Sequence, residues 1–128
     1  MRPTALVVED DAATRKLLRS LLEEHGCDVD EAVDGQQAIN LLMQHDYGVV
    51  LLDIVLPRIS GTAVMDYLMQ RDPAMLSRII VVTGLNVAEI RKLFPTVYSA
   101  LGKPVIPSRL LKVVNACLNR GDAQFTGA

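Results

Sequence analysis

The chain has few aromatic side chains. Its 128 residues include no tryptophan, two phenylalanines and three tyrosines, so aromatic residues make up 4% of the sequence. Half of the residues are nevertheless hydrophobic, and these are mostly leucine, valine, isoleucine and alanine, which is typical of buried strands covered by helices on both faces. A chain of this length is expected to form one domain with a single core. We therefore predict an α/β fold.

Cysteine and long apolar runs are also scarce. Cys27 and Cys117 lie far apart and form no CxxC or Cys/His cluster, so we interpret them as ordinary thiols in a reducing compartment. No segment approaches the roughly 20 apolar residues of a membrane span. The N-terminus lacks the apolar region and small-residue cleavage site of a secretion signal. We expect a soluble, cytoplasmic protein without membrane contact.

The sequence has no excess of positive charge. Its formal net charge is −2 at pH 7, whereas binding to nucleic-acid phosphates depends on clustered lysines and arginines. Direct nucleic-acid binding by this chain is therefore not expected. One short basic run, Arg15, Lys16 and Arg19, is either a solvated helix face or a docking contact for a protein partner.

Short aliphatic runs alternate along the chain with segments of helical periodicity. This rhythm predicts βαβ units around a parallel sheet. The expected strands comprise residues 5–8, 29–32, 48–52, 79–82 and about 97–101. The last expected helix aligns apolar residues on one side, namely Leu110, Leu111, Val114, Cys117 and Leu118. We assign residues 1–120 to one domain and residues 121–128 to a flexible C-terminal tail.

Polar residues follow four of the five strands. Ligands of open parallel sheets bind outside the carboxyl ends of the strands, so these residues are candidates for a functional site. They are Glu9 and Asp10 after the first strand, Asp53 after the third, Thr83 after the fourth and Lys103 after the fifth. Clustered carboxylates repel one another unless a cation offsets their charge. Ligands restricted to oxygen favour a hard ion, Mg²⁺ or Mn²⁺.

These residue types suit phosphoryl transfer. Asp10 and Asp53 are expected to ligate the metal directly. A phosphoryl group that approaches a carboxylate oxygen of Asp53 needs its other oxygens neutralised, and the metal, the Thr83 hydroxyl and the Lys103 ammonium can supply those contacts. The expected product is an acyl phosphate on Asp53.

The sequence resembles the receiver domain of two-component response regulators, with the chemotaxis receivers as the nearest type, across residues 4–119. The resemblance rests on four motifs in the expected order, namely VVEDD at 7–11, DIVLP at 53–57 followed by Gly61, Thr83-Gly84, and Lys103-Pro104. It implies a flavodoxin-like (βα)5 fold with strand order 2-1-3-4-5. It also implies a phosphoprotein that works as a switch and not as an enzyme, apart from its own autophosphorylation and autodephosphorylation.

The resemblance assigns a role to each site residue. It implies that Asp53 accepts phosphate from a histidine kinase or phosphotransfer protein. Asp10 would ligate Mg²⁺ directly, Glu9 would act mainly through a metal-bound water, and Val55 would contribute its backbone carbonyl.

Further roles concern the phosphoryl group and the output. Thr83 would bond a phosphoryl oxygen and Lys103 would pair with the phosphoryl charge, while the small Gly84 leaves the site accessible to donors and to water. A downstream effector is expected on the face formed by the fourth helix, the fifth strand and the fifth helix. We expect a monomer or a weak homodimer, and either a stand-alone receiver or a fragment of a larger regulator.

The sequence departs from the receiver pattern near its fifth strand. Receivers usually carry tyrosine or phenylalanine three residues before the lysine, and this chain has Ala100 there. Strand alternation places Tyr98 on the same face, so Tyr98 either replaces the missing aromatic or is a packing or surface residue. The stretch between Thr83 and Lys103 is about two residues short, which predicts a trimmed fourth helix or loop. The Lys103-Pro104 peptide can be cis or trans.

Three other functions are alternatives to a phosphorylated receiver. A receiver-like interaction module would bind partners without phosphorylation, and Ala100 is compatible with it. A small Mg²⁺-dependent phosphohydrolase with an aspartate nucleophile would want a second carboxylate two residues after Asp53, where Val55 stands. A flavin-binding protein would want a hydroxyl- and glycine-rich loop after the first strand, where the acidic residues 9–11 would repel a phosphate.

Overall fold

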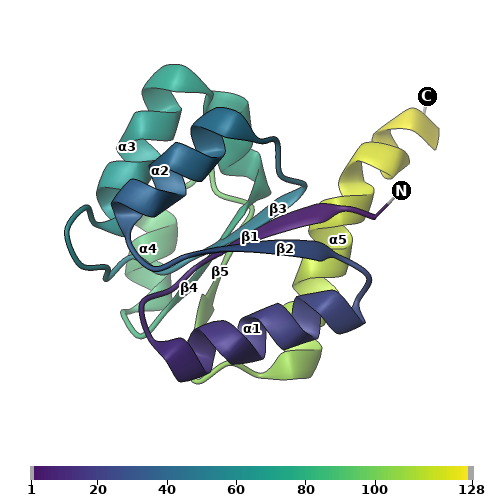
Figure 1. Cartoon of the computed structure of the whole chain (residues 1–128). Coiled ribbons are helices and arrows are strands. Elements are labelled where there is room, and N and C mark those ends of the chain that lie inside the picture. The colour runs from purple at the N-terminus through teal and green to yellow at the C-terminus, as the bar shows by residue number, and fades with distance from the viewer. Residues whose placement is uncertain (1, 127–128) are drawn as a thin grey trace.

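The computed structural model describes the backbone of residues 2–126 and, in the last helix, the side chains as far as residue 119. Five parallel strands form one sheet (Figure 1). They are β1 (Thr4–Val8), β2 (Asp28–Ala32), β3 (Val49–Leu52), β4 (Ile79–Thr83) and β5 (Ser99–Gly102). Their order in the sheet is β2-β1-β3-β4-β5, which confirms the predicted flavodoxin-like α/β fold.

Helices cover both faces of this sheet. They are α1 (Ala12–Glu24), α2 (Gly35–Gln44), α3 (Gly61–Arg71), the 3-10 helix η1 (Pro73–Arg78), α4 (Val87–Leu93) and α5 (Pro107–Thr126). Figure 1 shows α1 and α5 on one face and α2, α3 and α4 on the other. The short α4, with seven residues, agrees with the predicted trimming. No helix within residues 2–126 is long and apolar enough to cross a bilayer.

The central strands bury side chains in both directions. Alternate residues of β1 and β3 belong to two separate apolar clusters, one beneath α1 and α5 and one beneath α2, α3 and α4. Every residue of β3 and β4 is buried. Side chains on successive strand positions point to opposite faces, so a strand covered on both sides must be apolar throughout. This is why the unbroken aliphatic runs correctly predict the centre of the sheet.

Two segments differ from their predicted boundaries. The sequence pattern predicts no element at Pro73–Arg78, where the structure has the 3-10 helix η1. Proline suits the first turn of a helix. Helix α5 continues to Thr126, well into the segment 121–128 that we expected as a tail. Residues 127–128 of that segment lie outside the described residues, and the division at residue 120 stays a prediction.

Candidate functional site

Backbone hydrogen bonds place the residues that follow the strands. The amide of Glu9 donates a hydrogen bond to the carbonyl of the last residue of β2 at 3.0 Å. In the same way, the amide of Asp53 donates to the last carbonyl of β1 at 3.1 Å, and the amide of Lys103 donates to the last carbonyl of β4 at 2.8 Å. Each of these residues thus extends the strand pairing by one step. The register of a parallel sheet brings the three side chains to one edge, as the strand-end argument predicts.

Three carboxylates meet at this edge. Glu9, Asp10 and Asp53 each offer an oxygen, and these oxygens lie within 4.8 Å of one another. Glu9 and Asp53 are buried, with 1% and 5% of their surface exposed, whereas Asp10 is exposed. Burial raises the pKa of Glu9 above its ordinary value, against the opposite effect of the nearby Lys103.

Lys103 compensates two of these carboxylates. Its Nζ lies 2.8 Å from Oδ2 of Asp53 and 2.5 Å from Oε1 of Glu9. The Lys103 ammonium therefore forms an ion pair with each of the two buried carboxylates. Burial acts to lower the pKa of Lys103, but the two carboxylates outweigh burial and raise that pKa above its ordinary value. The Lys103-Pro104 peptide is cis.

The loop after β3 folds back over Asp53. The amide of Val55 donates to Oδ1 of Asp53 at 3.1 Å, and Val55 itself is 58% exposed. At the end of the loop, the amide of Gly61 donates to the carbonyl of Ile54 at 3.0 Å. A Cβ atom on Gly61 would lie 2.3 Å from the backbone oxygen of Asp53. Glycine is therefore required where the loop closes.

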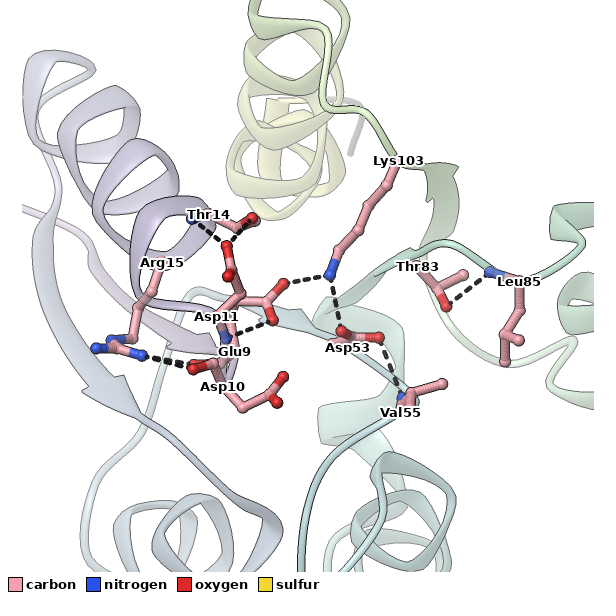
Figure 2. A network of polar contacts seen from close by, with 10 residues as sticks. All are labelled: Glu9, Asp10, Asp11, Thr14, Arg15, Asp53, Val55, Thr83, Leu85 and Lys103. Atoms are coloured by element: carbon pink, nitrogen blue, oxygen red, sulfur yellow. Dashed lines mark hydrogen bonds and ion pairs between the residues drawn. The ribbon is translucent and has the colours of Figure 1, made fainter.

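Thr83 is fully buried at the end of β4. Its hydroxyl oxygen accepts a hydrogen bond from the amide of Leu85 at 3.2 Å (Figure 2). A hydroxyl that accepts a bond in this way still has its own proton to donate. A Cβ atom on the neighbouring Gly84 would meet nothing within 4 Å, so the space beside Thr83 is open.

Asp11 does not belong to the carboxylate group. It is the N-cap of α1 and accepts from the amide of Thr14 at 2.9 Å and from its hydroxyl at 2.7 Å. These hydrogen bonds lower the pKa of Asp11. Helix capping thus accounts for one of the three acidic residues after β1, and the other two are left for the site.

The aromatic residue near β5 does not lie where alternation predicts it. Ala100 is buried in the cluster beneath α4, whereas Tyr98 packs against the cluster on the α1 and α5 side. The predicted shared face is wrong because β5 begins at Ser99, and alternation does not extend to a residue outside the strand. The position of the usual aromatic is therefore held by Ala100 alone.

The basic run on α1 is largely engaged within the domain. Arg15 and Arg19 both form ion pairs with Glu31 of β2, and Arg19 also contacts Glu23. Only Lys16 of the three remains exposed without an ion pair to the described residues. The solvated-face and docking interpretations both missed this intramolecular network.

Comparison with known proteins agrees with the fold. Residues 5–115 match the family model of the response regulator receiver domain, and the chain belongs to this family. The probable transcriptional regulatory protein SilR of Salmonella typhimurium is 31% identical over 121 residues, which cover 94% of this chain and 53% of SilR. The aerobic respiration control protein ArcA of Escherichia coli is 42% identical over 59 residues, or 46% of this chain and 25% of ArcA.

The chain spans about half the length of SilR, so it corresponds to one part of that regulator. Among solved structures, the receiver domain of a putative LuxO repressor protein from Vibrio parahaemolyticus has a TM-score of 0.85 and 25% identity, covering 98% of this chain and 97% of that one. The receiver domain of a sensor histidine kinase from Pseudomonas aeruginosa PAO1, which holds a magnesium ion in its active site cleft, has a TM-score of 0.83 and 21% identity, covering 93% and 99%.

Proposed function

We propose that this receiver accepts a phosphoryl group on Asp53 in an Mg²⁺-dependent reaction and thereby switches its interaction with a partner. The proposal rests on the groups that surround Asp53. Its buried carboxylate lies 2.8 Å from the ammonium of Lys103 and shares one edge of the sheet with Glu9 and Asp10. A nucleophile, a cation and additional oxygen ligands are thus grouped at the end of a parallel sheet, where ligands of this fold bind.

The transfer follows from these groups. A carboxylate oxygen of Asp53 forms a bond to phosphorus while the bond between phosphorus and the donor breaks. With phosphohistidine of a histidine kinase or phosphotransfer protein as donor, the imidazole nitrogen leaves with the electron pair. The Lys103 ammonium and the Thr83 hydroxyl stabilise negative charge on the phosphoryl oxygens.

The donor set fits Mg²⁺, with Mn²⁺ as an alternative. All ligands are oxygens, and carboxylate oxygens of Glu9, Asp10 and Asp53 lie within 4.8 Å of one another. Asp10 and Asp53 would hold the ion directly, Glu9 through a water, and Val55 by its backbone carbonyl. A bound ion supplies positive charge to the reacting phosphoryl group. The magnesium ion in the Pseudomonas aeruginosa receiver supports this assignment by analogy.

The output of the switch is a protein partner. We place it on the face formed by α4, β5 and α5, and we assign the protein to the cytoplasm as a monomer or weak homodimer. An acyl phosphate that moves a two-state equilibrium from 1:99 to 99:1 must supply roughly 5.5 kcal/mol of differential stabilisation. One observation favours a second candidate, an interaction module that works without phosphorylation: Ala100 leaves the usual aromatic position without a ring, and Tyr98 packs elsewhere.

Intact-protein mass spectrometry after incubation with acetyl phosphate tests the proposal. The wild type is expected to gain one phosphoryl group in the presence of Mg²⁺ and none in its absence. Asp53→Asn should gain none, whereas Asp66→Asn, which alters an exposed carboxylate on α3, should behave like the wild type. A folded wild type that gains no phosphoryl group from acetyl phosphate or from a phosphohistidine donor would refute the phosphoacceptor function and favour the interaction module.

A further inference from the structure

Asp10 is held differently from the other two carboxylates. Glu9 and Asp53 are buried and in contact with Lys103. Asp10 is exposed, and its carboxylate has no hydrogen bond or ion pair to any of the described residues. The position of this carboxylate therefore depends on the backbone of the turn between β1 and α1, residues 9–11.

That turn begins with two carbonyl groups that precede the helix. Because Asp11 is the N-cap, the first backbone hydrogen bond of α1 runs from the amide of Arg15 to the carbonyl of Asp11 at 2.9 Å. The carbonyls of Glu9 and Asp10 come too early in the chain to accept from the helix. The guanidinium of Arg15 donates to both of them, with Nη1 at 3.1 Å from the first and 3.3 Å from the second.

The same guanidinium is fixed on its other side. Nε of Arg15 lies 3.2 Å from Oε1 of Glu31, a residue of β2, which is the strand next to β1. The Arg15 side chain is only 20% exposed. Figure 2 shows it approaching the backbone of residues 9–10 from the side away from Lys103 and Asp53. Arg15 thus connects the turn to the neighbouring strand without entering the pocket.

We propose that Arg15 is a positioning residue for the metal ligand Asp10, acting through the two carbonyls of the turn. The inference rests on the Mg²⁺ site of the proposed function. Arginine suits this role because its planar guanidinium presents several donors at fixed angles, here to two carbonyls and a carboxylate at once. The ammonium of a lysine carries the same charge but has no planar fork to reach all three acceptors.

Arg19 provides a matched control. Its Nη1 lies 2.6 Å from Oε2 of the same Glu31, yet Arg19 makes no contact with the carbonyls of residues 9 and 10. Arg15→Lys keeps the charge and loses the geometry, whereas Arg15→Gln loses both. Arg19→Gln removes an equal charge from the same network and leaves the turn as it is.

The experiment is a titration with MgCl₂ alone, followed by NMR through the backbone amide signals of Asp11 and Asp53, on the wild type and the three variants. Both substitutions of Arg15 are expected to weaken Mg²⁺ binding by about tenfold, the lower end of the effect of residues that orient metal ligands. Arg19→Gln should bind Mg²⁺ like the wild type. Thermal unfolding in the absence of Mg²⁺ shows whether the variants are equally folded.

Each alternative has a distinct outcome. If Arg15→Lys keeps the wild-type affinity, or if Arg19→Gln weakens binding as much as Arg15→Gln does, the positioning role is refuted. Tighter binding by Arg15→Gln refutes it as well, because the guanidinium would then act only by repelling the cation. If the folded wild type shows no saturable Mg²⁺ binding, the metal site of the proposed function fails, and the role of Arg15 fails with it.

Discussion

Replacing Lys103 with methionine removes the cation from between two buried carboxylates and keeps most of the apolar stem. The side chains of Glu9 and Asp53 are 1% and 6% exposed, and Lys103 is their only ion-pair partner among the described residues. Their nearest ligand oxygens lie within 4.8 Å, a separation at which two unit charges repel by about 3.5 kcal/mol at an effective dielectric constant of 20. The variant must either bear this repulsion or bind a proton.

The expected destabilisation is about 3 kcal/mol at neutral pH. Removal of one partner from a buried ion pair costs about 3–5 kcal/mol, and the Lys103 side chain is 26% exposed, which favours the lower value. The cost depends on pH. The pKa of Glu9 is already raised by burial, and loss of the ammonium raises it further. A raised pKa in the folded state means that stability is lost as pH rises above the ordinary value of 4.5.

Urea denaturation in the absence of Mg²⁺ measures the effect. The deficit of Lys103→Met relative to the wild type should be largest at about pH 7 and smaller at about pH 5. Adding Glu9→Gln to the variant should recover part of it, because one of the two charges is then gone. Lys112→Met, which removes an exposed lysine of α5, serves as control. A deficit below about 1 kcal/mol, or one unchanged by pH and by Glu9→Gln, would show that the electrostatic reasoning is incorrect.

Two further predictions concern stability. Gly61→Ala places a Cβ atom 2.3 Å from the backbone oxygen of Asp53 and should lower the free energy of unfolding, measured with urea, by at least about 2 kcal/mol. Gly84→Ala has open space around it and should lower that free energy by less than about 1 kcal/mol. Equal stabilities of the two variants would contradict the close approach at Gly61. Tyr47→Phe removes a hydrogen bond of 2.7 Å from the fully buried phenol to Asp30 and should cost about 2 kcal/mol at neutral pH. Burial raises the pKa of Tyr47, so the stability advantage of the wild type over Tyr47→Phe should fall as pH rises above 10. Urea denaturation at several alkaline pH values that shows the same advantage throughout would contradict this.

The residues of the pocket could be predicted from the sequence because their positions depend on strand ends. An unbroken run such as residues 48–52 has to be a central strand, and a charged residue directly after it has to lie at the edge of the sheet. Parallel strands present their carboxyl ends at one edge, so Asp53 and Lys103 could be grouped before their contact was known. Distances and burial required the structure, since both depend on the register between strands.

Prediction was less accurate where a boundary or a long-range contact decides the outcome. The expected strand at 97–101 began two residues too early, and that shift was enough to place Tyr98 on the wrong face. The contact between Arg15 and Glu31 joins residues of α1 and β2. It depends on how the helix packs on the sheet, and a basic run on a helix gives no indication of its partner. Helix periodicity likewise could not show that α5 continues beyond residue 120.

Because backbone pairing at the ends of β1, β3 and β5 sets the places of Glu9, Asp53 and Lys103, the pocket is defined by the ladder of the sheet and not by the identity of the aliphatic side chains beneath it. Exchanges among similar aliphatic residues in either cluster change the stability of the domain before they change the spacing of the reacting groups. The core residues can therefore change while the site residues stay the same, and proteins with largely different cores can keep the same arrangement of site residues at the sheet edge.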